Sequence, residues 1–243
     1  MSTLFISDLH LCAARPQGNQ AFYRFLENEA AAADALYILG DLFEYWVGDD
    51  DLDDPFNASI VSALAALADR GVTLYFMHGN RDFVIGEAFA RASRVRLLED
   101  PALVDLYGTP TLLMHGDTLC TLDLAYQAFR REVRSAAWIR KLLARPLAER
   151  KAAVADLRQR SEQEKSSKTA EIMDVAPEEV EAALRCHGYP RLIHGHTHRP
   201  ARHLHSVDGH RCERWVLADW YQRGSYIECG TQGCRSVVLG QPG

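Results

Sequence analysis

Five short apolar runs recur along the chain, and each is followed at once by a glycine or a polar residue. They cover residues 3–7, 36–39, 72–77, 112–114 and 192–193. Unbroken apolar runs of this kind are typical of strands buried on both faces, as in a parallel sheet. Between the first three runs, apolar residues recur at helical spacing over residues 19–33 and from Pro55 to Arg70. This alternation of strands and helices predicts an α/β fold.

The region after residue 199 follows a different pattern. Its apolar and β-branched residues form short segments at residues 201–206, 213–218, 225–229 and 236–239. Short strands in close succession predict an antiparallel meander at the end of the chain.

Residues 122–187 contain no strand-like segment. Helical periodicity runs through residues 122–143 and 147–173, Pro146 lies between them, and Pro177 opens a third helix. We therefore expect a single domain over residues 1–243 with a helical insertion, residues 122–187, that forms a lid.

The composition is that of an ordinary globular domain. Of the 243 residues, 47% are hydrophobic and 25% are charged. The first residues lack the basic and apolar segments of a secretory signal, and no apolar run approaches the ~20 residues that cross a bilayer. The six cysteines form no Cys-x-x-Cys pair, so we expect reduced thiols in the cytoplasm.

Positive charge is concentrated in one part of an acidic protein. The net charge is −6, yet residues 130–168 hold twelve Lys or Arg against five Asp or Glu. This block indicates an anionic partner, and a helix with basic and apolar faces can rest on an anionic membrane surface. We expect no nucleic-acid partner, because no aromatic stacking platform is interleaved with the basic residues. No obligate protein partner is indicated.

Seven potential metal ligands lie just after the predicted strands. They are Asp8, His10, Asp41, Asn80, His115, His196 and His198. Strand ends in an open α/β sheet are where ligand sites form. Carboxylate, imidazole and amide donors suit Mn²⁺, Fe²⁺, Zn²⁺ or Mg²⁺, and Asp41 could bridge two ions. Two adjacent ions can activate water for attack on a phosphate ester or anhydride.

Other polar residues are assigned structural roles. Five of the remaining histidines are expected to form ordinary hydrogen bonds, namely His78, His187, His203, His205 and His210. His194 could support a ligand from behind, but an ordinary structural role is favoured for it as well. Asp82 and Asp117 are candidate acceptors that orient ligand imidazoles. The acidic run at residues 49–54 is expected to be a solvated loop, with Asp53 or Asp54 capping the next helix.

The ordered motifs Asp-x-His, Gly-Asp, Gly-Asn-x-Asp, His-Gly and Gly-His-x-His resemble the calcineurin-like metallophosphoesterase superfamily. The resemblance runs from Asp8 to His198. It implies a four-layer α/β sandwich of two mixed sheets flanked by helices. It also implies two ligand sets, Asp8, His10, Asp41 and His198 for one metal and Asp41, Asn80, His115 and His196 for the other.

Longer runs are similar to one branch, the UDP-2,3-diacylglucosamine hydrolase family of lipid A biosynthesis. These runs are residues 40–50, 77–83 and 195–201, together with the insertion that follows His115. The resemblance implies water attack at the α-phosphorus of the UDP-linked lipid, giving UMP and 2,3-diacylglucosamine 1-phosphate (lipid X). It implies two Mn²⁺ ions and a cytoplasmic protein held peripherally on the inner membrane. Substrate contacts would come from Asn80, Arg81, Asp123, Ser161, Lys165, Lys168 and His196.

Arg81 supports an anhydride substrate on chemical grounds. Many members of the superfamily that cleave poor leaving groups have a histidine after the asparagine, and here the residue is arginine. Arginine stays protonated, so it stabilises phosphate charge but does not donate a proton. A phosphate leaving group needs no proton. The alternatives are another nucleotide phosphodiesterase of the superfamily, less readily a phosphoprotein phosphatase or a nuclease, and a non-catalytic scaffold.

Overall fold

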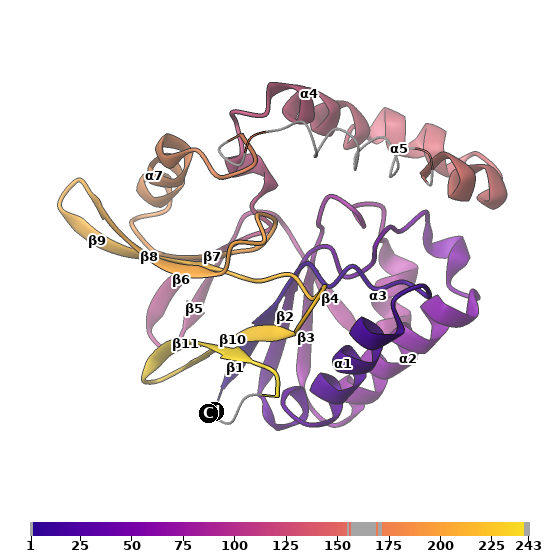
Figure 1. Ribbon diagram of the computed structural model, residues 1–243, viewed down its shortest axis with the longest axis horizontal. Helices are drawn as coiled ribbons and strands as arrows, with labels where there is room; N and C mark the ends of the chain where they lie inside the picture. Colours follow the sequence, from indigo (N-terminus) through magenta and orange to yellow (C-terminus); the bar gives the residue numbers. More distant parts are fainter. Residues whose placement is uncertain (1, 155, 157–168, 170–171, 241–243) are drawn as a thin grey trace.

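Two β-sheets packed face to face form the centre of the protein (Figure 1). The computed structural model describes residues 2–154, 156, 169 and 172–240. The strands are β1 (Thr3–Ile6), β2 (Ala35–Leu39), β3 (Thr73–Met77), β4 (Val95–Leu98), β5 (Ala102–Leu106), β6 (Thr109–Met114), β7 (Arg191–His194), β8 (Ala201–Val207), β9 (His210–Val216), β10 (Ser225–Gly230) and β11 (Gly233–Val238). The helices are α1 (Pro16–Glu27), α2 (Pro55–Asp69), α3 (Glu87–Ser93), α4 (Leu124–Val133), α5 (Ala136–Leu143) and α7 (Pro177–Cys186), with short 3-10 turns at Ala30–Ala32, Asp49–Asp51 and Asp117–Leu119.

Both sheets mix parallel and antiparallel strands. The six-stranded sheet has the order β11-β10-β1-β2-β3-β4, in which β1 to β4 are parallel. The five-stranded sheet has the order β5-β6-β7-β9-β8, in which β6, β7 and β9 are parallel. Parallel strands end at a common edge, so the loops after β1, β2, β3, β6 and β7 can meet there.

Three apolar clusters separate four layers. The alternation along β1 shows the principle, because Leu4 and Ile6 pack with the helices α1 to α3, whereas Phe5 packs between the two sheets. A third cluster joins the outer face of the second sheet to α7 through Val180 and Leu184. Both faces of the central strands are thus buried, which explains their unbroken apolar runs. The expected four-layer sandwich is confirmed.

The C-terminal strands differ from the prediction. They form two separate hairpins, β8-β9 in the second sheet and β10-β11 in the first, and not one meander. The strands β4 and β5 were not predicted at all. In β5 the residues alternate between half-buried and exposed, and this short amphipathic pattern is weaker than the apolar runs of the central strands.

The chain between β6 and β7 is helical throughout its described, regular parts. The expected helix over residues 122–143 is in fact two helices, because Arg134 ends α4 and the Ser135 hydroxyl accepts from Trp138 N to cap α5. Residues 147–154 are also helical. In Figure 1, α4 and α5 run across the top of the molecule, above the loops that follow the parallel strands.

The acidic run at residues 49–54 is not a solvated loop. The Asp49 carboxylate accepts from the backbone N of Gly86, Ala88 and Phe89 at 2.9–3.0 Å. Asp50 forms an ion pair with Arg150, whose side chain is buried and also donates to Val47 O. Asp54 caps α2 as expected, accepting from Phe56 N at 3.0 Å. The acidic run therefore attaches the basic helical region to the core.

Cys229 and Cys234 form a disulfide across β10 and β11. They lie directly opposite each other in the strand register, with their Cα atoms 4.1 Å apart. The expectation of reduced thiols is therefore wrong for this pair. Cys12, Cys120, Cys186 and Cys212 are free.

Replacing Arg150 with methionine should destabilise the protein by about 1–3 kcal/mol, because Val47 O and Asp50 lose their buried donor. The free energy of unfolding in urea would measure this. The matched control is Arg140→Met on an exposed residue of α5, which should change stability by less than about 0.5 kcal/mol. Equal losses for both variants would mean that the Arg150 contacts do not anchor the helical region.

Candidate metal centre

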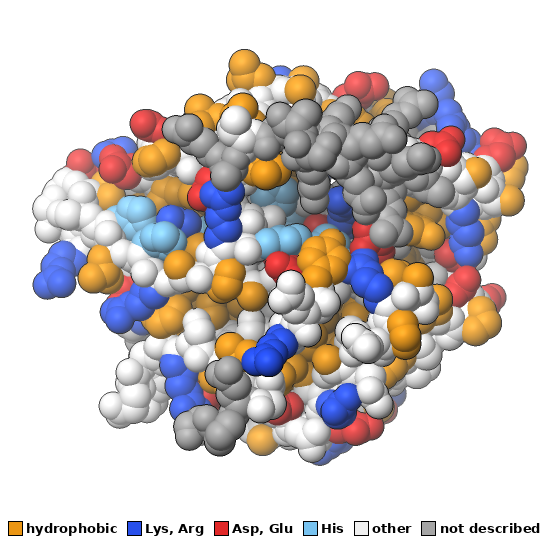
Figure 2. All heavy atoms as spheres, viewed as in Figure 1, with side chains coloured by type: hydrophobic (Ala, Val, Ile, Leu, Met, Phe, Trp, Pro, Cys, Tyr) orange, Lys and Arg blue, Asp and Glu red, His pale blue; other side chains and the backbone are white. Residues whose placement is uncertain are grey.

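All seven predicted ligands meet at the edge where the parallel strands end. Asp8 and His10 follow β1, Asp41 follows β2, and Asn80 follows β3. From the second sheet, His115 follows β6, and His196 and His198 follow β7. The side chains of Asp8, His10, Asp41 and His115 are at most 2% exposed. Figure 2 shows histidine, acidic and basic side chains gathered at the centre of this face.

The side chains form two groups on either side of Asp41. In the first group, His198 Nε2 lies 3.2 Å from Asp8 Oδ1 and 3.4 Å from His10 Nε2. Asp41 Oδ2 faces the first group, 3.8 Å from His10 Nε2, and Asp41 Oδ1 faces the second, 3.9 Å from His115 Nε2.

The second group centres on the amide of Asn80. Its Oδ1 lies 3.0 Å from His115 Nε2 and 3.0 Å from His196 Nδ1. One oxygen thus faces two imidazole nitrogens, which is the arrangement expected around a shared cation. Asp41 is the residue placed to serve both groups.

The donor set fits divalent metals. The donor atoms of Asp8, His10 and His198 lie within 4.8 Å of one another, as do those of Asp8, Asp41 and His115. All are oxygen or imidazole nitrogen, which suits hard or borderline ions such as Mn²⁺, Zn²⁺ and Mg²⁺. Two ring nitrogens that approach to 3.4 Å, as in His10 and His198, can both point lone pairs at one cation.

Five of the seven ligand residues have left-handed backbone. The φ angles are 54° at Asp8, 52° at His10, 53° at Asp41, 68° at His196 and 55° at His198. This region is uncommon for residues other than glycine, and such strain clusters at functional sites. Here it turns the chain sharply after β1, β2 and β7, and in the loops after β1 and β7 two ligands from one short loop reach the same centre.

Two glycines allow the loops to approach closely. A Cβ at Gly79 would lie 2.1 Å from Asp41 Oδ1, and one at Gly195 would lie 2.4 Å from Asp8 Oδ2. Neither position can hold a side chain without displacing a buried carboxylate. Gly79 and Gly195 are therefore packing requirements of the centre.

Burial and mutual charge shift the pKa values of these groups in opposite directions. Burial alone would raise the pKa of Asp8, but the hydrogen bond from His198 and the nearby imidazoles hold it well below its usual range. Burial lowers the pKa of His196 to about 3. Burial also opposes charge on His115, yet Asp41 and Asp117 raise its pKa to about 9. Burial thus disfavours a proton on His196, whereas the carboxylates favour positive charge at His115, and a divalent cation can supply that charge in place of a proton.

Groups behind the ligands fix their orientation. His115 Nδ1 lies 2.8 Å from Leu39 O, and His198 Nδ1 lies 3.6 Å from the Asp219 carboxylate. The expected role of Asp82 and Asp117 was wrong. Asp82 accepts from the backbone N of Gly79 and Leu42, and so joins two ligand loops without touching an imidazole.

Asp117 attaches the helix α4 to the centre. Its Oδ2 accepts from Tyr126 Oη at 2.8 Å and from Arg130 Nε at 2.7 Å. The Tyr126 ring stacks on His196 with 5.9 Å between centroids. Arg134 donates to Gly79 O at 2.8 Å, directly before Asn80. The end of the helical region nearest the centre is thus bonded to two ligand loops.

The other predicted site residues differ in how close they lie to the centre, and some lie outside the described residues. Arg81 follows Asn80, and its backbone N donates to Asp41 Oδ1 at 2.8 Å. Asp123 caps α4 by accepting from Tyr126 N at 3.1 Å. Ser161, Lys165 and Lys168 lie outside the described residues. His194, assigned a structural role, is fully buried and lies 3.1 Å from Arg214 Nη1.

The loop between β9 and β10 also contributes to the centre and was not predicted. Trp220 N donates to Asp8 O at 3.2 Å, and the Tyr221 ring stacks on His10 with 5.2 Å between centroids. The Arg15 guanidinium lies 4.7 Å from the centre of the Tyr221 ring. Only the unusual density of polar and aromatic residues in this loop could have indicated its role.

Comparison with known proteins identifies the family of the chain. The family model described as calcineurin-like phosphoesterase matches residues 1–200. Among solved structures, that of an archaeal phosphodiesterase aligns with 98% of this chain and 100% of that chain, at 13% identity and a TM-score of 0.46.

Curated relatives are much more similar. A UDP-2,3-diacylglucosamine hydrolase of Aromatoleum aromaticum is 57% identical over 227 residues, which cover 93% of this chain and 92% of the relative. A protein of the same name from Aeromonas salmonicida is 54% identical and covers 94% of this chain and 90% of its own length. The chain therefore belongs to the calcineurin-like phosphoesterase family, in the branch of the UDP-2,3-diacylglucosamine hydrolases.

Proposed function

We propose that this protein hydrolyses the diphosphate of UDP-2,3-diacylglucosamine to UMP and 2,3-diacylglucosamine 1-phosphate, by attack of water on the α-phosphorus. The observation that carries the proposal is the meeting of two ligand groups at Asp41, in a chain more than half identical to relatives named for this substrate. Hydrolysis within lipid A biosynthesis is the role that those names support.

The seven ligands divide between two metal positions in this proposal. One position takes Asp8, His10, Asp41 and His198, and the other takes Asp41, Asn80, His115 and His196. Two Mn²⁺ ions bound there would neutralise phosphate oxygens and make a water molecule more acidic. The protein's own part is to hold the ligands apart at fixed spacing and to orient His115 and His198 from behind.

Arg81 is proposed to bind the phosphate that leaves. Its backbone is fixed by the bond to Asp41, and its buried Nε has no hydrogen-bond partner among the described residues. A buried donor without a partner destabilises the folded protein unless a ligand accepts a hydrogen bond from it. A guanidinium can pair with two phosphate oxygens, and its permanent charge stabilises a departing phosphate without proton transfer.

We propose that residues 122–187 form the helical insertion that receives the acyl chains. Leu122, Leu124, Phe129 and Leu143 are large apolar side chains that remain 42–78% exposed. They lie on or beside α4 and α5, and Asp117 and Arg134 attach α4 to the metal centre. An acyl chain in contact with these side chains would keep the sugar near Asp123. Ser161, Lys165 and Lys168 are proposed to contact the sugar, phosphate or acyl linkages.

Peripheral attachment to the cytoplasmic face of the inner membrane is part of the proposal. The basic side chains of Arg131, Arg140 and Lys141 are exposed on α4 and α5, beside the apolar residues, and Arg145 is exposed just after α5. That combination favours an anionic lipid surface, from which a lipid substrate could enter. Among the described residues, no helix has the length and apolar character needed to cross a membrane.

Acyl chains should control turnover. We expect kcat/KM for UDP-2,3-diacylglucosamine to exceed that for UDP-N-acetylglucosamine by at least about a hundredfold, because each buried methylene contributes roughly 0.8 kcal/mol. Release of UMP from both substrates by the Mn²⁺-loaded protein measures the ratio. Equal turnover would identify a general nucleotide phosphodiesterase and contradict the lipid assignment.

Asp41→Asn should reduce Mn²⁺ binding at both positions, whereas His198→Asn should reduce it at one. The reason is that Asp41 faces both ligand groups and His198 faces only the first. Bound metal per chain can be counted by mass spectrometry, and Asp41→Asn should also lower kcat by on the order of a hundredfold or more. His203→Asn, on β8, is the control. Two tightly bound ions in Asp41→Asn would rule out the shared-ligand arrangement.

Arg81→His should lower kcat for the UDP-lipid by about 10²–10³-fold, the usual loss when one fixed donor to developing charge is removed. Metal content should stay at the wild-type level, because the side chain of Arg81 is outside both ligand groups. Steady-state kinetics and metal analysis of the same preparation test both points. Full activity in this variant would remove Arg81 from the mechanism.

A further inference from the structure

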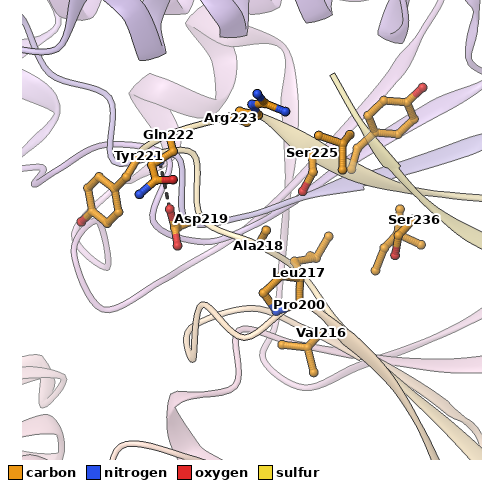
Figure 3. Close-up of a pocket in the computed structure, with 13 residues that line it drawn as sticks. Pro200, Val216, Leu217, Ala218, Asp219, Tyr221, Gln222, Arg223, Ser225 and Ser236 are labelled. Carbon is orange, nitrogen blue, oxygen red and sulfur yellow. Dashed lines mark hydrogen bonds between the residues drawn. The ribbon is translucent and has the colours of Figure 1, made fainter. Parts of the chain in front are cut away.

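A cavity of ≈ 500 Å³ opens beside the metal centre, at the loop between β9 and β10. Figure 3 shows Pro200, Val216 and Leu217 on one side of it and Ser225 and Ser236 on another. It lies where the ends of β9 and β10, from different sheets, diverge. The volume is within the range of small-molecule sites, about 300–1,000 Å³.

The chemistry of the cavity suits a flat group with polar edges. Val216, Leu217 and Ile227 give it an apolar floor, and all three are buried. Ser225 and Arg223 supply a hydroxyl and a guanidinium at its rim. A mainly apolar cavity with a few polar groups is the usual form of a small-molecule site, and a planar base with a polar edge has both kinds of surface.

Asp219 connects the cavity with the metal centre. This residue lines the cavity, and its Oδ2 lies 3.6 Å from His198 Nδ1. Its Oδ1 accepts from Tyr221 N at 2.9 Å, which holds the carboxylate between the centre and the cavity. The order along the structure is therefore His198, Asp219 and then the cavity.

We propose that this cavity binds the nucleoside half of the substrate, with the pyrimidine base in the slot and the ribose hydroxyls facing Asp219. The order His198, Asp219 and cavity matches the order phosphate, ribose and base in a nucleotide. A carboxylate is a suitable acceptor for ribose hydroxyls, and serine and arginine can bond the carbonyl edge of a pyrimidine. The inference rests on the proposed function, since a nucleotide must be the substrate.

The two ends of the substrate then leave the centre in different directions. The acyl chains would extend toward the helical region that includes α4 and α5, and the nucleoside toward the β9–β10 loop. The Ser225 hydroxyl and the Arg223 guanidinium can bond the polar edge of a base, whereas an acyl chain has no group to bond them, so this lining favours the nucleoside for the second direction.

The test is UMP binding to the Mn²⁺-loaded protein, measured by calorimetry in wild type, Ser225→Phe and Ser225→Ala. The phenylalanine fills the cavity and should weaken UMP binding at least tenfold, whereas the alanine, at the same position, should change it less than threefold. Hydrolysis of bis(p-nitrophenyl) phosphate, which has no nucleoside, should stay within twofold in both variants. Unchanged UMP binding in Ser225→Phe, or weakened binding of lipid X alone, overturns the proposal.

A second measurement uses the wild-type chain and so does not depend on how a variant folds. Photocross-linking with 5-iodo-UMP should label residues 216–227, and labelling confined to other parts of the chain overturns the proposal. The result of this cross-linking can be distinguished from the result of the hydrolysis assay that tests the proposed function. Hydrolysis of the UDP-lipid with labelling elsewhere would refute the cavity alone, and labelling here without hydrolysis would refute the lipid substrate alone.

Discussion

Asp41 is a buried carboxylate placed between two groups of imidazoles, and much of the architecture follows from the need to hold it there. Burial raises its pKa, and the nearby Asp8 raises it further. Two carboxylates so close together are stable as anions only if positive charge is supplied. The sheets end five strands at one edge, so that four histidines and Asn80 reach the same place and can hold divalent cations that supply this charge. The left-handed residues and the close-packed glycines at this edge are consequences of that crowding.

The helical region above the centre is attached to it by charge as well as by packing. Asp117 bonds α4 through Tyr126 and Arg130, and Asp50 binds the buried Arg150. These contacts explain an otherwise odd distribution of charge, in which a basic block lies within an acidic chain. Part of its charge neutralises buried or loop carboxylates of the core. The exposed remainder is available for an anionic substrate or surface, as the proposed function requires.

The sequence predicts the features that depend on local pattern. Unbroken apolar runs identified the central strands, and since parallel strands end at one edge, the polar residues after them could be expected to meet. Features that depend on tertiary register were missed. The partner of Cys229 becomes evident only from the pairing of β10 with β11, and the split of the C-terminal hairpins between two sheets leaves no local signal. Asp219 and Tyr221 lie in an irregular loop, where no periodicity indicates which way a side chain points.

The most direct test of the central claim is hydrolysis of UDP-2,3-diacylglucosamine by the Mn²⁺-loaded protein in H₂¹⁸O, with both products analysed by mass spectrometry. We expect ¹⁸O in UMP and none in 2,3-diacylglucosamine 1-phosphate, because water attacks the α-phosphorus and the lipid phosphate departs. Label in the lipid product would place the attack on the other phosphorus. Intact substrate, with a soluble phosphodiester hydrolysed instead, would contradict the assignment of this centre to a nucleotide-linked lipid.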